Sequence, residues 1–377
     1  MMYTIKNPYK SKILLRKPLS SPASTNKTCH LVLEAKDELL QFLPGDSVAL
    51  FVQNDPSLVK KILTLFNASG KELILNKRTK QKILFEEFLS TKANITFLST
   101  TCIRFLVSIQ SDTAIQEKFH ALLTNNEQLI PFLHEHDLVD MLKQLDLCAL
   151  SPQLLCDRLL PLLPRFYSIA SSAHSHPGEI HILVKELVIQ INKKKKLGVA
   201  SHFLCDLAKE NITPIPMAIH PSRFHLPDTP NQDIIMIGPG TGIAPFKSFL
   251  EERIIKKDKG KNWLFFGERN KAHDFYYQDF LETLVTNKQL TLNTAFSRDQ
   301  KEKIYVQHLM TKQGSEIYSW LENGAYIYVC GDAKKMAIQV EKTLIEIIKT
   351  YKKCHESDAL DYLKKLKEEK RYLKDVY

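Results

Sequence analysis

The chain has 377 residues, of which 44% are apolar and 25% are charged, a composition typical of a globular protein with two or three domains. This balance excludes a disordered or collagen-like chain. No apolar run approaches the roughly 20 residues that span a bilayer, and the start of the chain lacks the apolar block of a signal peptide. We therefore expect a cytoplasmic protein without membrane insertion.

Basic residues outnumber acidic ones, 52 to 42, which gives a formal net charge of +10. Such a surplus could attract nucleic acid, an anionic membrane or an acidic protein. Because the chain has no basic stripe interleaved with aromatic residues, nucleic acid is not expected as a partner. The seven cysteines are odd in number and include no C-x-x-C pair, so we predict neither a disulfide framework nor a metal site.

The first half of the chain changes from extended to helical patterns and back. Residues 29–51 are predicted to form short strands joined by a turn at Pro44-Gly45-Asp46. Apolar residues then recur at helical spacing, which predicts a helical insertion over about 52–163. Extended patterns return at 165–170 and at 179–191, so the predicted β domain is split in the sequence.

After residue 230, four apolar segments alternate with helical stretches: DIIMIG, NWLFFG, LTLNTAF and AYIYVCG. This alternation predicts βα units on a parallel sheet that is covered on both faces. Gly238, Gly267, Ser297 and Gly331 lie at the ends of these segments. We therefore expect their loops to meet in one crevice beyond the carboxyl ends of the strands, where doubly wound α/β domains bind ligands.

The turn after the first of these segments has the features of an anion site. Only 12 glycines occur in the chain, yet Gly238, Gly240 and Gly242 lie close together, and Pro245 follows in the first turn of a predicted helix. Glycine lets the backbone approach a phosphate, and the helix N-terminus favours negative charge. The spacing differs from the G-x-G-x-x-G fingerprint, so the turn taken alone fits an ordinary loop as well as a nucleotide site.

Four further motifs accompany this turn in order along the chain. They are Arg165-Phe166-Tyr167-Ser168, Gly198-Val199-Ala200-Ser201, the stretch from Ser297 to Gln307, and Tyr328-Val329-Cys330-Gly331-Asp332. With the final Asp375-Val376-Tyr377 they resemble the NADPH-dependent diflavin reductases, in particular the flavoprotein components of bacterial sulfite reductases, over essentially the whole chain. The resemblance implies a multidomain fold like that of ferredoxin-NADP reductases. A split antiparallel β-barrel FAD domain with the helical insertion would occupy 1–228, and a doubly wound α/β NADP domain would occupy 229–377.

The resemblance assigns FAD to the β domain. Arg165 offers a planar, permanently charged group that suits a pyrophosphate, and Tyr167, two residues further along a strand, points to the same side. In the family this tyrosine ring lies on the flavin, and the turn that begins at Gly198 lends backbone N–H groups to the pyrophosphate. The FAD-binding residues so implied are Arg165, Phe166, Tyr167, Ser168, Leu183, Val184, Lys185, Gly198, Val199, Ala200, Ser201 and Tyr377.

The stretch from Ser297 to Gln307 favours NADP over NAD. Cations and hydroxyls can bind a 2′-phosphate, whereas NAD sites place an acidic residue on the ribose. The NADP-binding residues implied by the resemblance are Gly240, Thr241, Ser297, Arg298, Lys303, Ile304, Tyr305, Val306, Gln307 and Cys330. The chain carries Gln339 where the family has an acidic residue, which leaves the contact on the adenosine side open.

Three residues far apart in the sequence are implied to form the catalytic centre. On position alone Cys330 would be a buried cysteine at a strand end, and Tyr377 would be a frayed terminus. The resemblance instead places Ser168, Cys330 and Asp375 where hydride passes between nicotinamide and flavin. It also stacks the ring of Tyr377 on the flavin face that the nicotinamide must reach.

The expected function is transfer of electrons from NADPH through FAD to a separate acceptor protein. FMN is not expected, because the chain begins at the connecting region and the FMN domain of the diflavin enzymes does not precede it. The acceptor would be a flavodoxin, a ferredoxin or a haem-containing reductase. The alternatives are a flavodoxin or ferredoxin NADP reductase unconnected with sulfite, a non-catalytic docking subunit or nucleotide sensor, and a flavin-free nicotinamide dehydrogenase, which the two FAD motifs disfavour.

Overall fold

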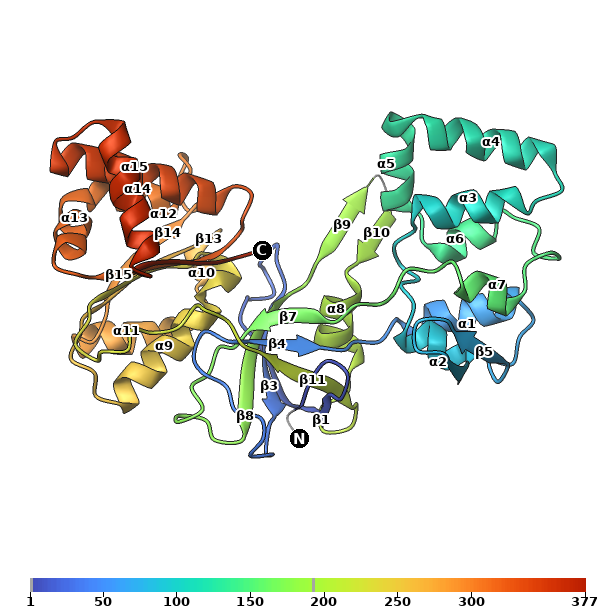
Figure 1. The fold of residues 1–377 in the computed structure, drawn as a ribbon, viewed down its shortest axis with the longest axis horizontal. Coiled ribbons are helices and arrows are strands. Elements are labelled where there is room, and N and C mark those ends of the chain that lie inside the picture. Colours follow the sequence, from blue (N-terminus) through green and yellow to red (C-terminus); the bar gives the residue numbers. More distant parts are fainter. Residues whose placement is uncertain (1–2, 192–193) are drawn as a thin grey trace. The chain divides into compact units, whose positions relative to one another are not determined.

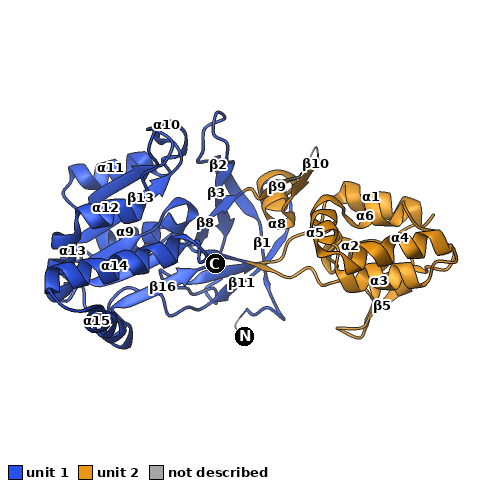
Figure 2. Ribbon diagram, turned by 90° about the horizontal axis from the view of Figure 1, so that it is seen from above, with its two compact units in different colours: residues 1–49, 166–185, 210–377 blue, residues 50–165, 186–209 orange. Residues whose placement is uncertain are grey.

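The computed structural model describes residues 3–191 and 194–377. The contacts between residues divide the chain into two compact units, drawn in blue and orange in Figure 2. Unit 1 comprises residues 1–49, 166–185 and 210–377, and unit 2 comprises residues 50–165 and 186–209. The domain boundaries expected from the sequence, 1–228 and 229–377, stay predictions.

The first part of unit 1 consists of short strands: β1 (Tyr9–Ser11), β2 (Ile13–Pro18), β3 (Thr28–Glu34), β4 (Ser47–Leu50), β7 (Arg165–Ser168), β8 (Glu179–Lys185) and β11 (Ile215–His220). They form two sheets, in the orders β1-β11-β4-β7 and β2-β3-β8. Strand β1 pairs antiparallel with β11, and β3 pairs antiparallel with both β2 and β8 (Figure 1). A bridge between Ile169 and Ile182 links the two sheets, so the predicted antiparallel β domain is confirmed.

The rest of unit 1 is an α/β domain. Its strands are β12 (Ile234–Ile237), β13 (Asn262–Glu268), β14 (Thr291–Phe296), β15 (Tyr326–Gly331) and β16 (Tyr372–Val376). Its helices are α9 (Ala244–Ile255), α10 (Lys271–Asp274), α11 (Gln278–Thr286), α12 (Val306–Lys312), α13 (Gly314–Glu322), α14 (Met336–Lys352) and α15 (Glu356–Glu368). The strands form one parallel sheet in the order β14-β13-β12-β15-β16. The sequence predicted the first four strands but treated the end of the chain as a tail, whereas the structure adds it to the sheet as β16.

Both faces of this sheet are covered, because side chains alternate along each strand. Ile234 and Met236 of β12 pack in one core with residues of α9 and α11. Ile235 and Ile237 face the opposite core, which α12, α13, α14 and α15 cover (Figure 1). The continuous apolar run of β12 is therefore buried on both sides, as the pattern predicted.

Unit 2 contains the helical insertion. Its helices are α1 (Pro56–Leu65), α2 (Phe85–Thr91), α3 (Thr100–Ser108), α4 (Thr113–Thr124), α5 (Asn126–Glu135), α6 (Leu138–Leu142), α7 (Pro152–Cys156) and α8 (Val199–His202), the last continuing as a π-helical turn over Phe203–Leu207. Two hairpins join them, β5 (Leu73–Asn76) with β6 (Gln81–Leu84), and β9 (Val188–Ile191) with β10 (Lys194–Leu197). The first hairpin interrupts the predicted helical segment.

The single extended stretch expected at 179–191 is instead two strands in different sheets. Strand β8 ends at Lys185, and β9 begins at Val188. Between them, the Leu187 N–H donates to Ser201 Oγ at 2.9 Å and its carbonyl accepts from the Gly198 N–H at 2.8 Å. These bonds hold the Leu187 backbone at the start of α8 and not in the sheet formed by β2, β3 and β8.

The structure can be compared with the sequence on two further points, membrane-spanning helices and disulfides. Among the helices of the described residues, none is long and apolar enough to cross a membrane. Within the part of the chain that the structure describes, none of the seven cysteines forms a disulfide.

Candidate functional site

The glycine turn connects β12 to α9 through close packing. A Cβ added to Gly242 would lie 2.2 Å from the Cys330 carbonyl oxygen, and one added to Gly238 would lie 2.5 Å from the Phe246 ring. Side chains at these two positions would collide with the neighbouring strand and helix. Gly240 differs, because its φ of +60° favours glycine while the space beside it is open, with Glu268 Oε1 nearest at 3.4 Å. The turn therefore presents bare backbone at Gly240.

A pocket of about 930 Å³ opens beside Gly240, at the carboxyl edge of the parallel sheet. Residues from all four predicted loops line it, which is the convergence that the sequence indicated. Of the residues expected at the FAD or NADP site, those in the lining are Lys185, Gly240, Thr241, Ser297, Arg298, Lys303, Tyr305, Val306, Gln307 and Tyr377. A second hollow of about 660 Å³ lies at the opposite edge of the sheet and contains none of them.

The loop after β14 is held in place by the loop after β13. The Ser297 N–H donates to the Glu268 carbonyl at 2.9 Å, and the Arg298 N–H donates to the Arg269 carbonyl at 2.8 Å. The side chains of Arg298 and Lys303 are exposed in the pocket wall. The backbone bond fixes the position of Arg298, and the charged ends of both side chains are exposed at the pocket.

The pocket also contains residues that the sequence analysis did not select. Arg269, Lys334 and Lys335 add positive charge, and Gln339 lies in the lining at the position where the family has an acidic residue. Ile304 and Cys330, both expected at the NADP site, are not among the lining residues. The basic residues after the β15 strand could have been found from their place beyond a strand end, as Ser297 was.

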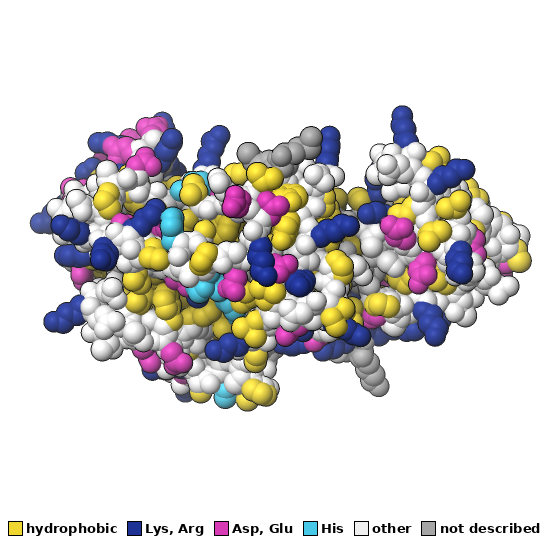
Figure 3. Space-filling model, turned by 90° about the horizontal axis from the view of Figure 1, so that it is seen from below, with side chains coloured by type: hydrophobic (Ala, Val, Ile, Leu, Met, Phe, Trp, Pro, Cys, Tyr) yellow, Lys and Arg dark blue, Asp and Glu magenta, His cyan; other side chains and the backbone are white. Residues whose placement is uncertain are grey.

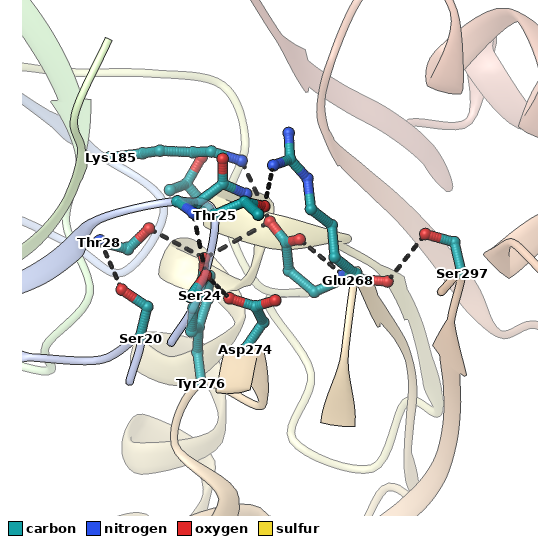
Figure 4. A network of polar contacts seen from close by, with 12 residues as sticks. Ser20, Ser24, Thr25, Thr28, Lys185, Glu268, Asp274, Tyr276 and Ser297 are labelled. Atoms are coloured by element: carbon teal, nitrogen blue, oxygen red, sulfur yellow. Dashed lines mark hydrogen bonds and ion pairs between the residues drawn. The ribbon is translucent and has the colours of Figure 1, made fainter. Parts of the chain in front are cut away.

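Glu268 forms an ion pair at the pocket wall (Figure 4). Its side chain is 6% exposed, and Oε1 lies 3.2 Å from Lys185 Nζ at the end of β8. Tyr276 donates to the same oxygen at 3.4 Å and bonds with Thr28 Oγ1 at 2.9 Å. Burial, then the Glu268 charge, raises the pKa of Tyr276, so this phenol stays protonated. The network ties β3 and β8 to β13; the assignment of Lys185 to FAD stays a prediction.

Ser168, Cys330 and Asp375 meet at one point of unit 1. The Ser168 hydroxyl donates to Asp375 Oδ2 at 2.8 Å, and the Cys330 thiol lies 3.9 Å from the same oxygen. Strand β16 explains the contact, because Cys330 and Asp375 are register partners in the parallel sheet. Burial, then the Asp375 charge, raises the pKa of the Cys330 thiol well above its ordinary range. The group therefore holds one carboxylate between two neutral donors.

Tyr377 is fixed by backbone and side-chain bonds. Its N–H donates to the Gly331 carbonyl at 3.1 Å, and its carbonyl accepts from the Ala333 N–H at 3.1 Å. The phenol oxygen lies 2.9 Å from Thr241 Oγ1. The side chain is still 64% exposed, so the ring presents a large free surface beside the pocket.

The other residues expected to bind FAD are divided between the two units. Phe166, Tyr167, Leu183 and Val184 belong to unit 1, while Arg165 and the turn Gly198, Val199, Ala200 and Ser201 belong to unit 2. Phe166 is 50% exposed, whereas Leu183 and Val184 are buried, so only their backbone could touch a ligand. Ser201 Oγ is occupied by Leu187 and Gly198, which leaves the backbone of this turn as its donor surface.

Two domain families match the chain. A FAD binding domain matches residues 2–203, and an oxidoreductase NAD-binding domain matches residues 236–342. Over its full length the chain is 35% identical to the sulfite reductase [NADPH] flavoprotein alpha-components of Salmonella paratyphi B and Zymomonas mobilis, and 34% identical to that of Baumannia cicadellinicola. It spans 61–62% of the length of these relatives. The predicted resemblance is confirmed, and the matched domains support FAD and NADPH as the cofactors.

Proposed function

Because the chain belongs to the FAD binding domain family, we propose that it is an NADPH-dependent flavoprotein reductase that passes electrons from NADPH through FAD to a separate acceptor protein. The observation that supports this most directly is the contact of Ser168 and Cys330 with Asp375, close to Tyr377 and the cationic pocket. FAD, when bound, supplies the chemistry, since it accepts a hydride and releases electrons singly. The residues of the chain bind, orient and stabilise charge.

In this proposal, Asp375 is the central charge of the hydride-transfer site. It fixes the Ser168 hydroxyl by accepting its hydrogen bond. It would also stabilise the positive charge that develops on the nicotinamide ring as hydride leaves. The Cys330 thiol stays neutral because burial raises its pKa, so it adds no second negative charge. Tyr377 would cover the flavin until the nicotinamide displaces its exposed ring.

The cationic pocket would bind the adenosine end of NADPH. Arg298 and Lys303 can place positive charge on a 2′-phosphate, while Ser297 and Tyr305 offer hydroxyl donors. The exposed backbone at Gly240, at the start of the turn into α9, fits the approach of a pyrophosphate. We propose that Arg165 and the turn at Gly198 bind the FAD pyrophosphate.

We propose that the acceptor is a haem-containing sulfite reductase component, because the similar proteins are named as flavoprotein components of sulfite reductase. A flavodoxin or ferredoxin is the second candidate, favoured by the +10 net charge, which would attract an acidic carrier. On the face drawn in Figure 3, Lys and Arg side chains are scattered among acidic and apolar ones. Attraction would therefore come from the net charge more than from one patch of that face. With either acceptor, we propose that the protein acts in the cytoplasm.

Anaerobic reduction tests the catalytic proposal. The purified protein with FAD should lose its visible flavin absorbance when NADPH is added in a stopped-flow instrument. Cys330→Ala should slow this step by about tenfold or more, because small misplacements at a reacting centre have large effects on rate, without loss of FAD. Cys102→Ala is the matched control, since Cys102 is also buried but lies in unit 2. If Cys330→Ala leaves the rate of flavin reduction unchanged, Cys330 packs in the core and takes no part in hydride transfer.

The salt dependence of electron transfer tests whether the acceptor is an acidic carrier protein. The Debye length falls from roughly 10 Å at 0.1 M salt to roughly 3 Å at 1 M, so electron transfer to an acidic carrier should slow steeply over this range. Reduction of a small uncharged quinone should respond much less, because it carries no charge for salt to screen. Equal salt dependence for the two acceptors would remove the electrostatic support for an acidic carrier.

A further inference from the structure

The loop between β7 and β8 ends in a tight turn that carries possible metal ligands. Pro177 and Gly178 are its central residues, Gly178 has a φ of +79°, and the Glu179 N–H donates to the His176 carbonyl at 3.2 Å. Proline followed by a positive-φ glycine is the pattern of a type II turn. The turn brings His176 and Glu179 near each other, and His181, two residues further along β8, points to the same side as Glu179.

The side chains of these three residues converge. One ligand atom from each of His176, Glu179 and His181 lies within 4.8 Å of the other two. His181 Nε2 is 2.9 Å from Glu179 Oε2, and the ring centroids of His176 and His181 are 4.2 Å apart. Glu179 is 39% exposed at the side chain, so an ion in solution could reach the group.

The His181 ring is buried, and only one of its nitrogens has a partner among the described residues. The His181 side chain is only 7% exposed, and its Nδ1 is buried without a hydrogen-bond partner among the described residues. Nε2, the nitrogen that bonds to Glu179, is the one that faces the group, so the ion would bind there and not at the unpaired Nδ1.

Charged side chains of α9 lie beside the group. Lys247 is the positive charge beside it, but it is already ion-paired with Glu251 and donates to the Ala170 carbonyl at 3.2 Å. Glu251 also lies 3.0 Å from His176 Nε2. Glu251 thus bonds to both the Lys247 ammonium group and the His176 ring. A carboxylate that holds a ligating histidine is a common feature of metal sites.

We propose that His176, Glu179 and His181 bind one divalent transition-metal ion, with Zn²⁺ as the ion that fits best. Two imidazoles and one carboxylate are ligands that Zn²⁺ accepts at about 2.0–2.2 Å, with a fourth position left for water. The bound ion would replace the hydrogen bond between His181 and Glu179. Small side-chain rotations would bring His176 into the same shell.

The ion would stabilise the nucleotide-binding part of unit 1. The same loop braces α9, because the Ser172 N–H donates to Glu251 Oε2 at 3.0 Å and His174 Nδ1 lies 2.9 Å from Glu252. Helix α9 in turn begins directly after the glycine turn at Gly240–Ile243. Fixing the loop would therefore fix the helix that follows the pocket, so the site is structural.

Metal titration tests the proposal. The tag-free full chain with FAD bound would be stripped with a chelator, and Zn²⁺ binding measured by isothermal titration calorimetry. Co²⁺ would report the ligand set through its visible absorption. We expect one ion per chain and an increase in melting temperature. His176→Ala and Glu179→Gln should each weaken binding by at least roughly 10- to 100-fold, since changes even in the residues that support metal ligands have effects of that size.

His174→Ala is the matched control. His174 lies in the same loop and also contacts a glutamate of α9, but it is outside the converging group. Its loss should leave the stoichiometry and affinity unchanged. Absence of saturable binding by the wild type overturns the proposal, as does binding that persists in both His176→Ala and Glu179→Gln. Equal weakening by His174→Ala would also overturn it, because the metal would then lie elsewhere in the loop.

Discussion

Replacing Arg298 by alanine should change the choice between NADPH and NADH. Arg298 lies in the wall of the 930 Å³ pocket, with an exposed side chain. Its backbone N–H is bonded to the Arg269 carbonyl at 2.8 Å, and alanine can keep that bond. Among the described residues, the Arg298 side chain has one hydrogen bond, a long one of 3.5 Å from Nη1 to Thr25 Oγ1. The substitution should therefore remove the cation without disturbing the loop.

The expected size follows from the type of interaction. A hydrogen bond to a charged group contributes about 1.5–3 kcal/mol, which corresponds to roughly 10- to 150-fold in affinity. Because Arg298 is exposed, water and salt weaken the contact, so we expect the lower end, about tenfold at 0.1 M salt. NADH lacks the 2′-phosphate, so its binding should change little.

The assay compares kcat/KM for NADPH and NADH with an artificial acceptor, and the dissociation constant of NADP+ at two salt concentrations. Lys301→Ala is the matched control, since Lys301 is an exposed cation in the same loop but is not among the residues that line the pocket. It should leave the preference almost unchanged. Equal losses for NADPH and NADH in Arg298→Ala would refute the reasoning, because Arg298 would then act on the loop and not on the phosphate.

Three other substitutions or conditions test separate parts of the structure. Tyr377→Ala should bind NADP+ more tightly and discriminate less against NADH, because the exposed ring no longer competes for the flavin face; unchanged dissociation constants and kcat/KM ratios would place the ring elsewhere. Gly242→Ala should lower the thermal stability and nucleotide binding, since its Cβ would lie 2.2 Å from the Cys330 carbonyl oxygen; a stable variant with normal binding would contradict the tight turn. Burial lowers the pKa of His30 and of His181 to about 3, while both should titrate near 6.5 when unfolded. The unfolded chain then binds more protons between these values, so the free energy of unfolding should fall below about pH 6.5, by at most about 1.4 kcal/mol per pH unit for each histidine; denaturant titrations at pH 7 and pH 5 that agree would contradict this.

The sequence by itself determined the features that depend on neighbouring residues. The apolar run of β12 and the glycines after it predicted a buried strand and a tight turn, because strand periodicity and positive φ are local properties. The stretch from Ser297 to Gln307 predicted a cationic loop for the same reason, since its donors are contiguous in the chain. Their position at strand ends then predicted the common crevice, because parallel strands end at the same edge.

Only the tertiary structure decided which distant residues meet. Strand β16 has a short, charged sequence, YLKDV, and joins the sheet because β15 leaves an edge free for pairing, which no local pattern records. This pairing sets Asp375 opposite Cys330 and brings it to Ser168, 207 positions away in the chain. The ion pair of Lys185 with Glu268 arises in the same way. The turn at Pro177-Gly178 is visible in the sequence, but only the folded loop brings His176, Glu179 and His181 together. The cysteine pattern, from which no metal site was predicted, does not record this convergence.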